Sequence, residues 1–222
     1  LIVVIVTFFV LNMYAWDYFL FVQLWPGSWL YQNKSKYEYD FGKSELKYNF
    51  TNNYFTIHGI WPQYDNGTWP QFCNASSGFN SAILKPIHDN LTKYWTDFRN
   101  AQVFWKHEYT KHMLCAQDIY PNPYKLFWYG LYLRNSMDIF DVFQNNDIYP
   151  NNNIYYNVNK LSDILKKHFN VSIVITCASH NKHSILTEIH FCMNKRFELF
   201  DCPSNHYHDK CNKESVLYNI IN

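Results

Sequence analysis

The chain of 222 residues contains little glycine (6 residues), little proline (8) and few charged residues (17%). So little glycine and proline excludes a collagen-like or low-complexity chain, and 48% hydrophobic residues exclude a disordered tail. A formal net charge of +1 excludes a global positive field that would attract nucleic acid, so any basic site must be local. The sequence therefore predicts a globular protein with a substantial core.

Long hydrophobic runs are also scarce. The run LIVVIVTFFVL, residues 1–11, is too short to span a bilayer and is typical of the apolar part of a secretory signal peptide. The alternative is a buried first strand, but the run lacks the alternation of a half-buried strand. We expect residues 1–15 to be a signal peptide truncated at its start. The mature protein would then be secreted, or delivered to a vacuole or lysosome, with no membrane attachment.

The six cysteines include no C-x-x-C pair, which argues against a zinc site, and we expect neither a metal nor a cofactor. An even number of cysteines in an exported chain predicts three disulfides, for which 15 pairings exist. N-x-[S/T] sequons predict glycosylation. They begin at Asn33, Asn49, Asn66, Asn74, Asn90 and Asn170. Asn49 and Asn170 are the weakest candidates because they adjoin strand-like segments.

The hydrophobic pattern predicts an α+β fold. Strand-like segments span Trp16–Leu30, Tyr54–His58, Val171–Thr176, Ile185–Phe191 and Arg196–Asp201. Apolar residues at three- and four-residue steps predict helices over Ser81–Phe98 (with Ser81 as its cap), Val103–Leu114, Tyr124–Phe143 and Leu161–Phe169. Strands at both ends and helices between them favour a central antiparallel sheet stabilised by disulfides, with several helices packed on one side of it. No linker interrupts the pattern, so we expect residues 16–222 to form a single domain.

The first segment with chemical potential is FTIHGIWPQ, residues 55–63. His58 ends a predicted strand, and Gly59 and Pro62 are expected to turn the chain there. This arrangement would expose the imidazole at an edge of the sheet. The first strand is likewise expected to end in a turn, at Pro26-Gly27.

The second segment is FWKHEYTKHMLC, in which His107, Glu108, Lys111 and His112 have helical offsets 0, 1, 4 and 5. These offsets correspond to about 0°, 100°, 40° and 140° around an α-helix, so four ionisable side chains share one face. Taken alone, the pattern also fits solvated histidines beside a surface ion pair. A zinc protease is excluded because H-E-x-x-H would need histidine at position 111. A cysteine protease is excluded because disulfides account for all six thiols.

Together the two segments resemble the active-site blocks of the ribonuclease T2 family of secreted endoribonucleases, whose patterns run roughly F-T-I-H-G-L-W-P and H-E-W-x-K-H-G-T-C. FVQLWPGSW, residues 21–29, is similar to the family's first strand. The region Cys177–Cys211, with LTEIHFC and FDCP, is similar to its C-terminal cystine region. The resemblance covers nearly all of Trp16–Asn212. Its spacing is most similar to plant members, including those used in pollen rejection, but the N-terminal cystine frequent in plant members is absent.

The resemblance implies a reaction and a set of roles. Single-stranded RNA would be cleaved by transphosphorylation through a 2′,3′-cyclic phosphate to a 3′-phosphate, with His58 as general acid and His112 as general base. His107 would hold the phosphate, while Glu108 and Lys111 would stabilise the transition state. DNA lacks the 2′-hydroxyl and would not react. One histidine must be neutral and the other charged, so the rate should follow a bell-shaped curve centred on the acid side of neutrality.

The family also suggests base-binding residues. Trp61 and Phe104 would stack on bases, although packing under the active-site helix would equally explain them. Asp97 would accept a hydrogen bond from a base. The family's cystine pattern implies the pairs Cys73–Cys115, Cys177–Cys211 and Cys192–Cys202. The first pair would tie the loop after His58 to the helix that bears His112.

The chain departs from the family pattern where Met113-Leu114 replace the usual Gly-Thr and Tyr109 replaces Trp. Glycine allows close backbone packing that methionine does not, so the end of the helix could be altered. A second hypothesis is therefore a catalytically impaired relative that acts as a binding or recognition protein. The presence of all five polar site residues favours the enzyme. For an enzyme, self-incompatibility, defence and phosphate scavenging remain open as roles, and no protein partner is identified.

Overall fold

The computed structural model describes residues 16–32, 53–73, 78–97, 100–180, 183–205, 211 and 213–220. The expected signal segment, residues 1–15, lies outside this range, as do the sequons at Asn33, Asn49 and Asn74.

A seven-stranded sheet runs through the described part of the chain. Its strands are β1 (Tyr18–Leu24), β2 (Thr56–Gln63), β3 (Tyr155–Asn157), β4 (Val174–His180), β5 (His183–Met193), β6 (Leu199–Phe200) and β7 (Ser215–Leu217). Five of them follow the order β2-β1-β5-β7-β3, and β4 and β6 each pair with β5. The strands pair in antiparallel fashion except for β5 and β7, which are parallel.

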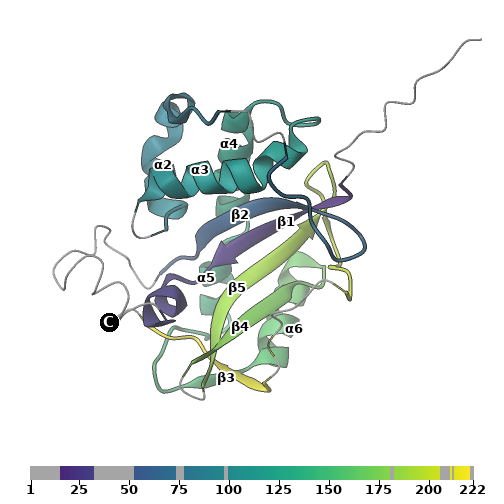
Figure 1. Cartoon of the computed structure of the whole chain (residues 1–222). Helices are drawn as coiled ribbons and strands as arrows, with labels where there is room; N and C mark the ends of the chain where they lie inside the picture. The colour runs from purple at the N-terminus through teal and green to yellow at the C-terminus, as the bar shows by residue number, and fades with distance from the viewer. Residues whose placement is uncertain are drawn as a thin grey trace, which may run out of the picture.

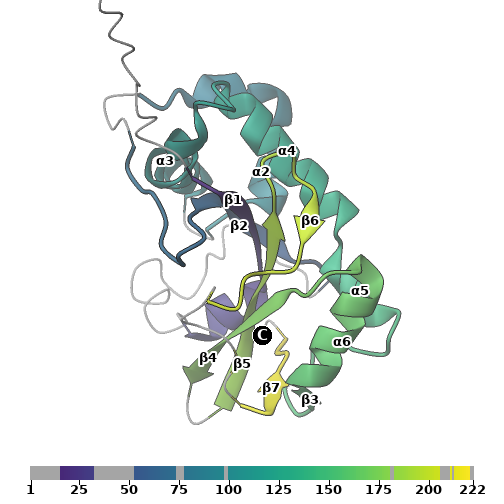
Figure 2. The same cartoon turned by 90° about the vertical axis from the view of Figure 1, so that its right-hand side faces the viewer.

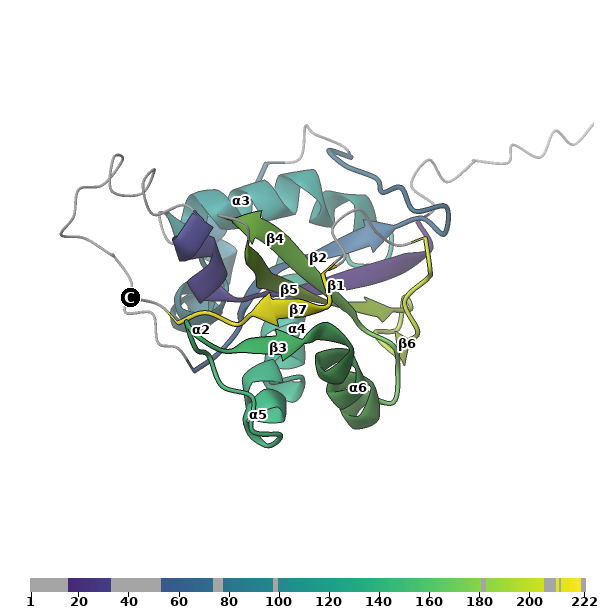
Figure 3. The ribbon, with the colours of Figure 1, turned by 90° about the horizontal axis from the view of Figure 1, so that it is seen from below.

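The helices confirm the expected α+β class (Figure 1). They lie on both sides of the sheet, so the expected placement on one side is wrong (Figure 2, Figure 3). Besides a short helix over residues 26–32, they are η1 (Ser81–Ile87), α2 (His88–Tyr94), α3 (Ala101–Lys111), η2 (Met113–Ala116), α4 (Pro123–Ser136), α5 (Ile139–Gln144) and α6 (Val158–Phe169). Figure 2 shows α4, α5 and α6 against one face of the sheet. The view from below in Figure 3 places α3 on the other side of the sheet from α5 and α6.

Strand β1 lies at the centre of the core, and its residues 18–22 are all buried. Its alternate side chains face opposite ways, as the pleat requires. Phe19 and Phe21 belong to the large core cluster, whereas Leu20 and Val22 belong to a smaller cluster on the opposite face. The smaller cluster forms the floor beneath the candidate site.

Strand β2 continues through Gly59 and Pro62, so the expected turn at Gly59 is wrong. Proline is tolerated because β2 is an edge strand that pairs only with β1 among the described strands, and an edge position needs no second ladder donor. Residues 26–32 form a short helix rather than the expected turn. Pro26 is its first residue, where the missing N–H costs no hydrogen bond.

The predicted helices are correct in place but not in extent: two of them are divided in the structure, and α6 begins three residues before the predicted Leu161. The segment from Ser81 divides into η1 and α2, with Pro86 inside η1, and Asn80 rather than Ser81 provides the side-chain cap. The segment from Tyr124 divides into α4 and α5 because the Asp138 side chain accepts two backbone N–H groups and starts a new helix. Strands β3 and β7 escaped prediction because each has three residues.

The three disulfides are those that the family resemblance implies: Cys73–Cys115, Cys177–Cys211 and Cys192–Cys202. Cys73–Cys115 connects the loop after β2 to η2. Beside it, the Phe72 amide donates to the Lys111 carbonyl over 2.8 Å and satisfies one of the free carbonyls at the end of α3. Two links thus hold the end of α3 to the segment that follows β2.

Helix α3 begins at a side-chain cap, because the Asn100 side chain accepts a hydrogen bond from the Val103 amide. Asn100→Ala should therefore lower the free energy of unfolding by about 1 kcal/mol. Urea unfolding measures the effect. Gln102→Ala, at an exposed position within the same helix, is the matched control and should change stability by less than about 0.5 kcal/mol. Equal effects of the two changes would contradict the cap.

Candidate active site

A cleft of about 460 Å³ lies where β2, β5 and α3 approach one another. Its lining residues are His58, Trp61, Gln63, Trp69, His107, Glu108, Lys111, His112, Glu188 and His190. All five residues expected to be catalytic are among them. The volume is within the range of sites for small ligands.

A β-bulge aims His58 into this cleft. Val22 pairs with Gly59 and Gln23 with Ile57, so His58 is an extra residue in β2. Strict alternation from Trp61 would turn position 58 toward the core, but the bulge lets Ile57 occupy the core and His58 the cleft. The imidazole is therefore at a sheet edge, as expected, within a strand that does not end there.

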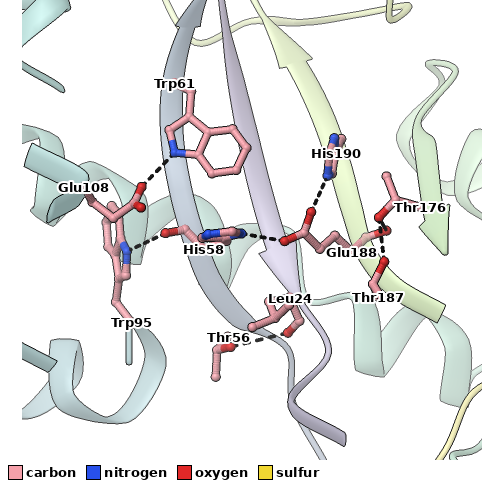
Figure 4. Close-up of polar contacts among 10 residues, drawn as sticks. All are labelled: Leu24, Thr56, His58, Trp61, Trp95, Glu108, Thr176, Thr187, Glu188 and His190. Atoms are coloured by element: carbon pink, nitrogen blue, oxygen red, sulfur yellow. Dashed lines mark hydrogen bonds and ion pairs between the residues drawn. The ribbon is translucent and has the colours of Figure 1, made fainter. Parts of the chain in front are cut away.

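The bulged backbone is held by two tryptophans. The indole Nε1 of Trp95 donates to the His58 carbonyl over 2.9 Å (Figure 4). The Trp95 carbonyl in turn accepts from Nε1 of Trp105, in α3, over 2.6 Å. A carbonyl freed from the strand ladder by the bulge thus gains a donor, which is how a buried polar group avoids a desolvation cost.

Trp61 contacts both candidate histidines. Its ring centroid lies 4.8 Å from that of His58 and 5.0 Å from that of His112. Its Nε1 donates to Oε2 of Glu108 over 2.7 Å. A Cβ on Gly59 would collide with the Trp61 indole and the Glu108 carboxylate, so only glycine fits beneath this hydrogen bond. Trp61 therefore has a structural role at the centre of the cleft.

Helix α3 presents His107, Glu108 and Lys111 to the cleft, and His112 follows as its C-cap residue. The predicted common face is thus present, although the helix ends one residue before His112. Glu108 and His112 are buried, at 1% and 6% exposure. His107 is exposed at the cleft rim.

The departure at Met113-Leu114 fits the fold without strain. Both side chains are buried in the core, and the chain passes from α3 directly into η2. Met113 does not have a positive φ, so no glycine is needed there. The substituted Tyr109 is also buried, and its hydroxyl accepts a hydrogen bond from Gln117.

The two histidines have opposite protonation preferences. Burial lowers the pKa of His58, but the charge and hydrogen bond of Glu188 raise it more, giving a pKa of about 8. Burial lowers the pKa of His112 to about 3, assisted by the positive charges of Lys111 and His58. Near pH 6, therefore, His58 is protonated and His112 is neutral.

Two further groups have altered pKa values. Burial raises the pKa of Glu108 to about 7, against the opposing effects of His58 and the Trp61 hydrogen bond. Below that pH, Glu108 is a neutral acid that can donate a hydrogen bond. Burial, together with Lys111 and His58, lowers the pKa of His107.

The expected base-binding residues lie in different places. Phe104 lies on α3, one turn before His107 and Glu108, and its ring centroid is 5.8 Å from that of His58. Asp97 does not line the cleft, and its Oδ1 accepts a hydrogen bond from the Asn100 amide in the loop before α3. Of the described sequons, Asn66, Asn90 and Asn170 are all exposed.

Four lining residues escaped the sequence analysis: Gln63, Trp69, Glu188 and His190. Glu188 and His190 are two apart on β5 and so project to the same face. The segment LTEIHFC was predicted as a strand and compared with the family's cystine region, and neither observation singled out these two side chains. A glutamate in a strand expected to be largely buried was the available signal, because a buried carboxylate requires a partner.

Within the described residues, no group of three or more His, Cys, Asp or Glu side chains has a geometry suited to holding a metal ion. No described helix is long and apolar enough to cross a bilayer.

An α+β fold whose cleft is lined by four histidines, a lysine and two glutamates has the side chains that acid–base catalysis uses. A model of the ribonuclease T2 family matches residues 16–202, and the chain belongs to that family. It is an enzyme of the ribonuclease T2 type.

Relatives of similar identity come from animals and plants. The chain is 32% identical to "Ribonuclease Oy" of Magallana gigas over 196 residues, covering 84% of this chain and 87% of that protein. It is 29% identical to "Extracellular ribonuclease LE" of Solanum lycopersicum, covering 84% and 80% of the two chains. The structure is similar to RNase MC1 mutant Y101A in complex with 5′-UMP, with a TM-score of 0.77, 27% identity and coverage of 91% and 98%.

The close packing over Gly59 allows a direct test. Gly59→Ala should displace the Trp61–Glu108 pair and lower the free energy of unfolding by about 1–3 kcal/mol, as overpacking does. Gly78→Ala is the matched control, because a Cβ at that position would have no described atom within 4 Å. Urea unfolding and tryptophan fluorescence report the two effects. Equal stability of both variants would show that the close packing is not present in solution.

Proposed function

We propose that the protein is a metal-independent endoribonuclease that cleaves single-stranded RNA by transphosphorylation. The observation that carries the proposal is the pair of histidines in one cleft with opposite protonation preferences. Such a pair supplies a base and an acid at the same pH, which RNA cleavage requires. Family membership and the nucleotide bound by the structural relative support an RNA substrate.

In this mechanism, neutral His112 removes the proton of the 2′-hydroxyl, and the 2′-oxygen attacks phosphorus. The bond from phosphorus to the 5′-oxygen breaks as protonated His58 donates its proton to that oxygen. The products are a 2′,3′-cyclic phosphate and a free 5′-hydroxyl. Water can then attack phosphorus as neutral His58 takes its proton. The bond from phosphorus to the 2′-oxygen breaks as protonated His112 donates to that oxygen, which gives a 3′-phosphate and restores the 2′-hydroxyl.

The remaining cleft residues stabilise the charge that develops on the phosphoryl oxygens. Lys111 and His107 lie on the same helix face and supply positive charge when protonated. Glu108 is mostly protonated on the acid side of neutrality, so it donates a hydrogen bond to a phosphoryl oxygen instead of repelling it. Trp61 and Phe104 offer faces on which bases stack.

The reaction predicts a characteristic dependence on pH. The rate should rise as His112 loses its proton near pH 3 and fall as His58 loses its proton near pH 8. Oxidised protein incubated with single-stranded RNA and EDTA from pH 3 to pH 9 should therefore show a bell-shaped rate and cyclic-phosphate ends. DNA of the same sequence should remain intact.

Histidine variants provide the control. His112→Ala and His58→Ala should each lower the rate by about 10² to 10⁴-fold, the usual contribution of a general acid or base. His168→Ala, at an exposed position on α6, should leave the rate unchanged. Intact RNA at every pH would favour the catalytically impaired binding protein. If cleavage required added metal, metal independence would be refuted but the ribonuclease activity would stand.

We also propose that the protein is exported and glycosylated. Three disulfides and three exposed described sequons support this. When the full chain is expressed in a secreting eukaryotic cell, peptide-N-glycosidase should lower its mass, and Asn66→Gln with Asn90→Gln should remove part of that change. An unglycosylated intracellular product would contradict export. Recognition, defence and phosphate scavenging would each use the same cleavage of RNA.

A further inference from the structure

Glu188 joins two histidines across the floor of the cleft. Its Oε1 lies 2.5 Å from Nδ1 of His58, and its Oε2 lies 2.8 Å from Nε2 of His190 (Figure 4). The Glu188 side chain is 17% exposed and that of His190 is 5% exposed. Neither residue belongs to the two segments that carry the proposed chemistry.

We propose that Glu188 is a positioning residue that holds Nδ1 of His58 and so presents the protonated Nε2 of that imidazole to the leaving 5′-oxygen. This inference rests on the proposed function and extends it to a residue of β5. Glu188 does not touch the reacting atoms; it acts through His58.

The geometry of an imidazole supports these separate roles for Nδ1 and Nε2 of His58. When Nδ1 donates to a carboxylate, the ring can rotate little, and the remaining nitrogen is left to exchange a proton. Carboxylates that orient a catalytic or ligating histidine act in this way in other enzymes. His112 contrasts with this arrangement, because its buried Nδ1 makes no hydrogen bond with any described residue.

Glu188 is itself held in place by a second bulge. Thr176 pairs with Glu188 and Cys177 with Leu186, so Thr187 is an extra residue in β5. The bulge keeps Leu186 in the core while Glu188 faces the cleft. The Thr187 hydroxyl bonds that of Thr176 over 2.8 Å, and the Thr187 carbonyl accepts from the Trp25 amide over 2.8 Å. The carboxylate is thus fixed by its backbone as well as by His190.

Glu188 is also the carboxylate that keeps its charge in the working range of pH. The charged and titratable groups facing His58 are Glu188 on β5 and Glu108, Lys111 and His107 on α3, with His112 beyond them. Burial opposes ionisation of Glu188, but its bonds and charge interactions with His58 and His190 hold its pKa well below the usual range. Glu108 becomes neutral below about pH 7.

The test is Glu188→Gln, which retains the shape of the side chain and one acceptor oxygen but removes its charge. Without that charge, burial and Lys111 leave the pKa of His58 at or below its ordinary value. The falling limb of the rate–pH curve should therefore move down by about one unit or more, with up to about a tenfold loss of kcat at pH 7. The rising limb, set by His112, and KM should change little.

Two variants make the result specific. Glu188→Asp retains the charge and should restore part of the falling limb, which a purely structural role would not predict. Glu198→Gln removes a carboxylate from the exposed turn after β5 and should leave both limbs in place. Identical pH profiles for Glu188→Gln and wild type would overturn the proposal.

A readout that needs no activity separates this proposal from the proposed function. The Cε1–H resonance of His58, followed by NMR, should titrate near pH 8 in wild type and at least about one unit lower in Glu188→Gln. If wild type cleaved no RNA but this shift occurred, the proposed function would fail and the pairing would stand. If RNA were cleaved and His58 titrated alike in both proteins, the pairing would fail. If Glu188→Gln did not fold, titration of His58 near or below pH 6.5 in the wild-type protein would still refute the pairing with Glu188.

Discussion

The site depends on the register of two neighbouring strand pairs. In a regular strand successive side chains alternate, so one extra residue reverses the face of every side chain beyond it. The extra residue in β2 allows Ile57 and Ile60 to pack in the core while His58 reaches the cleft. The extra residue in β5 does the same for Leu186 and Glu188. The fold therefore retains its apolar face and still directs an acid–base pair to the opposite face.

Burial then assigns each group its protonation state. His112 is enclosed beside positive charges, which favours the neutral imidazole, whereas His58 lies against a carboxylate, which favours the cation. Glu108 is enclosed without a paired cation bonded to it and stays protonated into the neutral range. Three groups with ordinary pKa values between about 4 and 7 are thus separated by environment alone, as acid–base catalysis needs.

The sequence predicted the α3 side of the cleft well, because helical spacing is local and places Glu108 and Lys111 on one face whatever surrounds them. It predicted the β5 side poorly. The contact between Glu188 and His58 spans 130 residues and depends on strand pairing that no local pattern reveals. The predicted end of the strand before Gly59 was also wrong because the position of the strand in the sheet was unknown. Proline and glycine interrupt a central strand but are accepted in an edge strand such as β2. The spacing of apolar residues also predicted one continuous helix over Tyr124–Phe143, whereas in the structure the Asp138 side chain caps a separate helix, α5.

The bond between Cys73 and Cys115 gives this arrangement a dependence on redox conditions. Cys115 lies three residues after His112, and the Phe72 amide beside Cys73 closes the end of α3. A nascent chain still in contact with reducing thiols would lack one of the two restraints that bring the α3 terminus to the β2 segment. Completion of the cleft is thereby coupled to oxidation, because the α3 terminus gains its full set of restraints only where the Cys73–Cys115 bond can form.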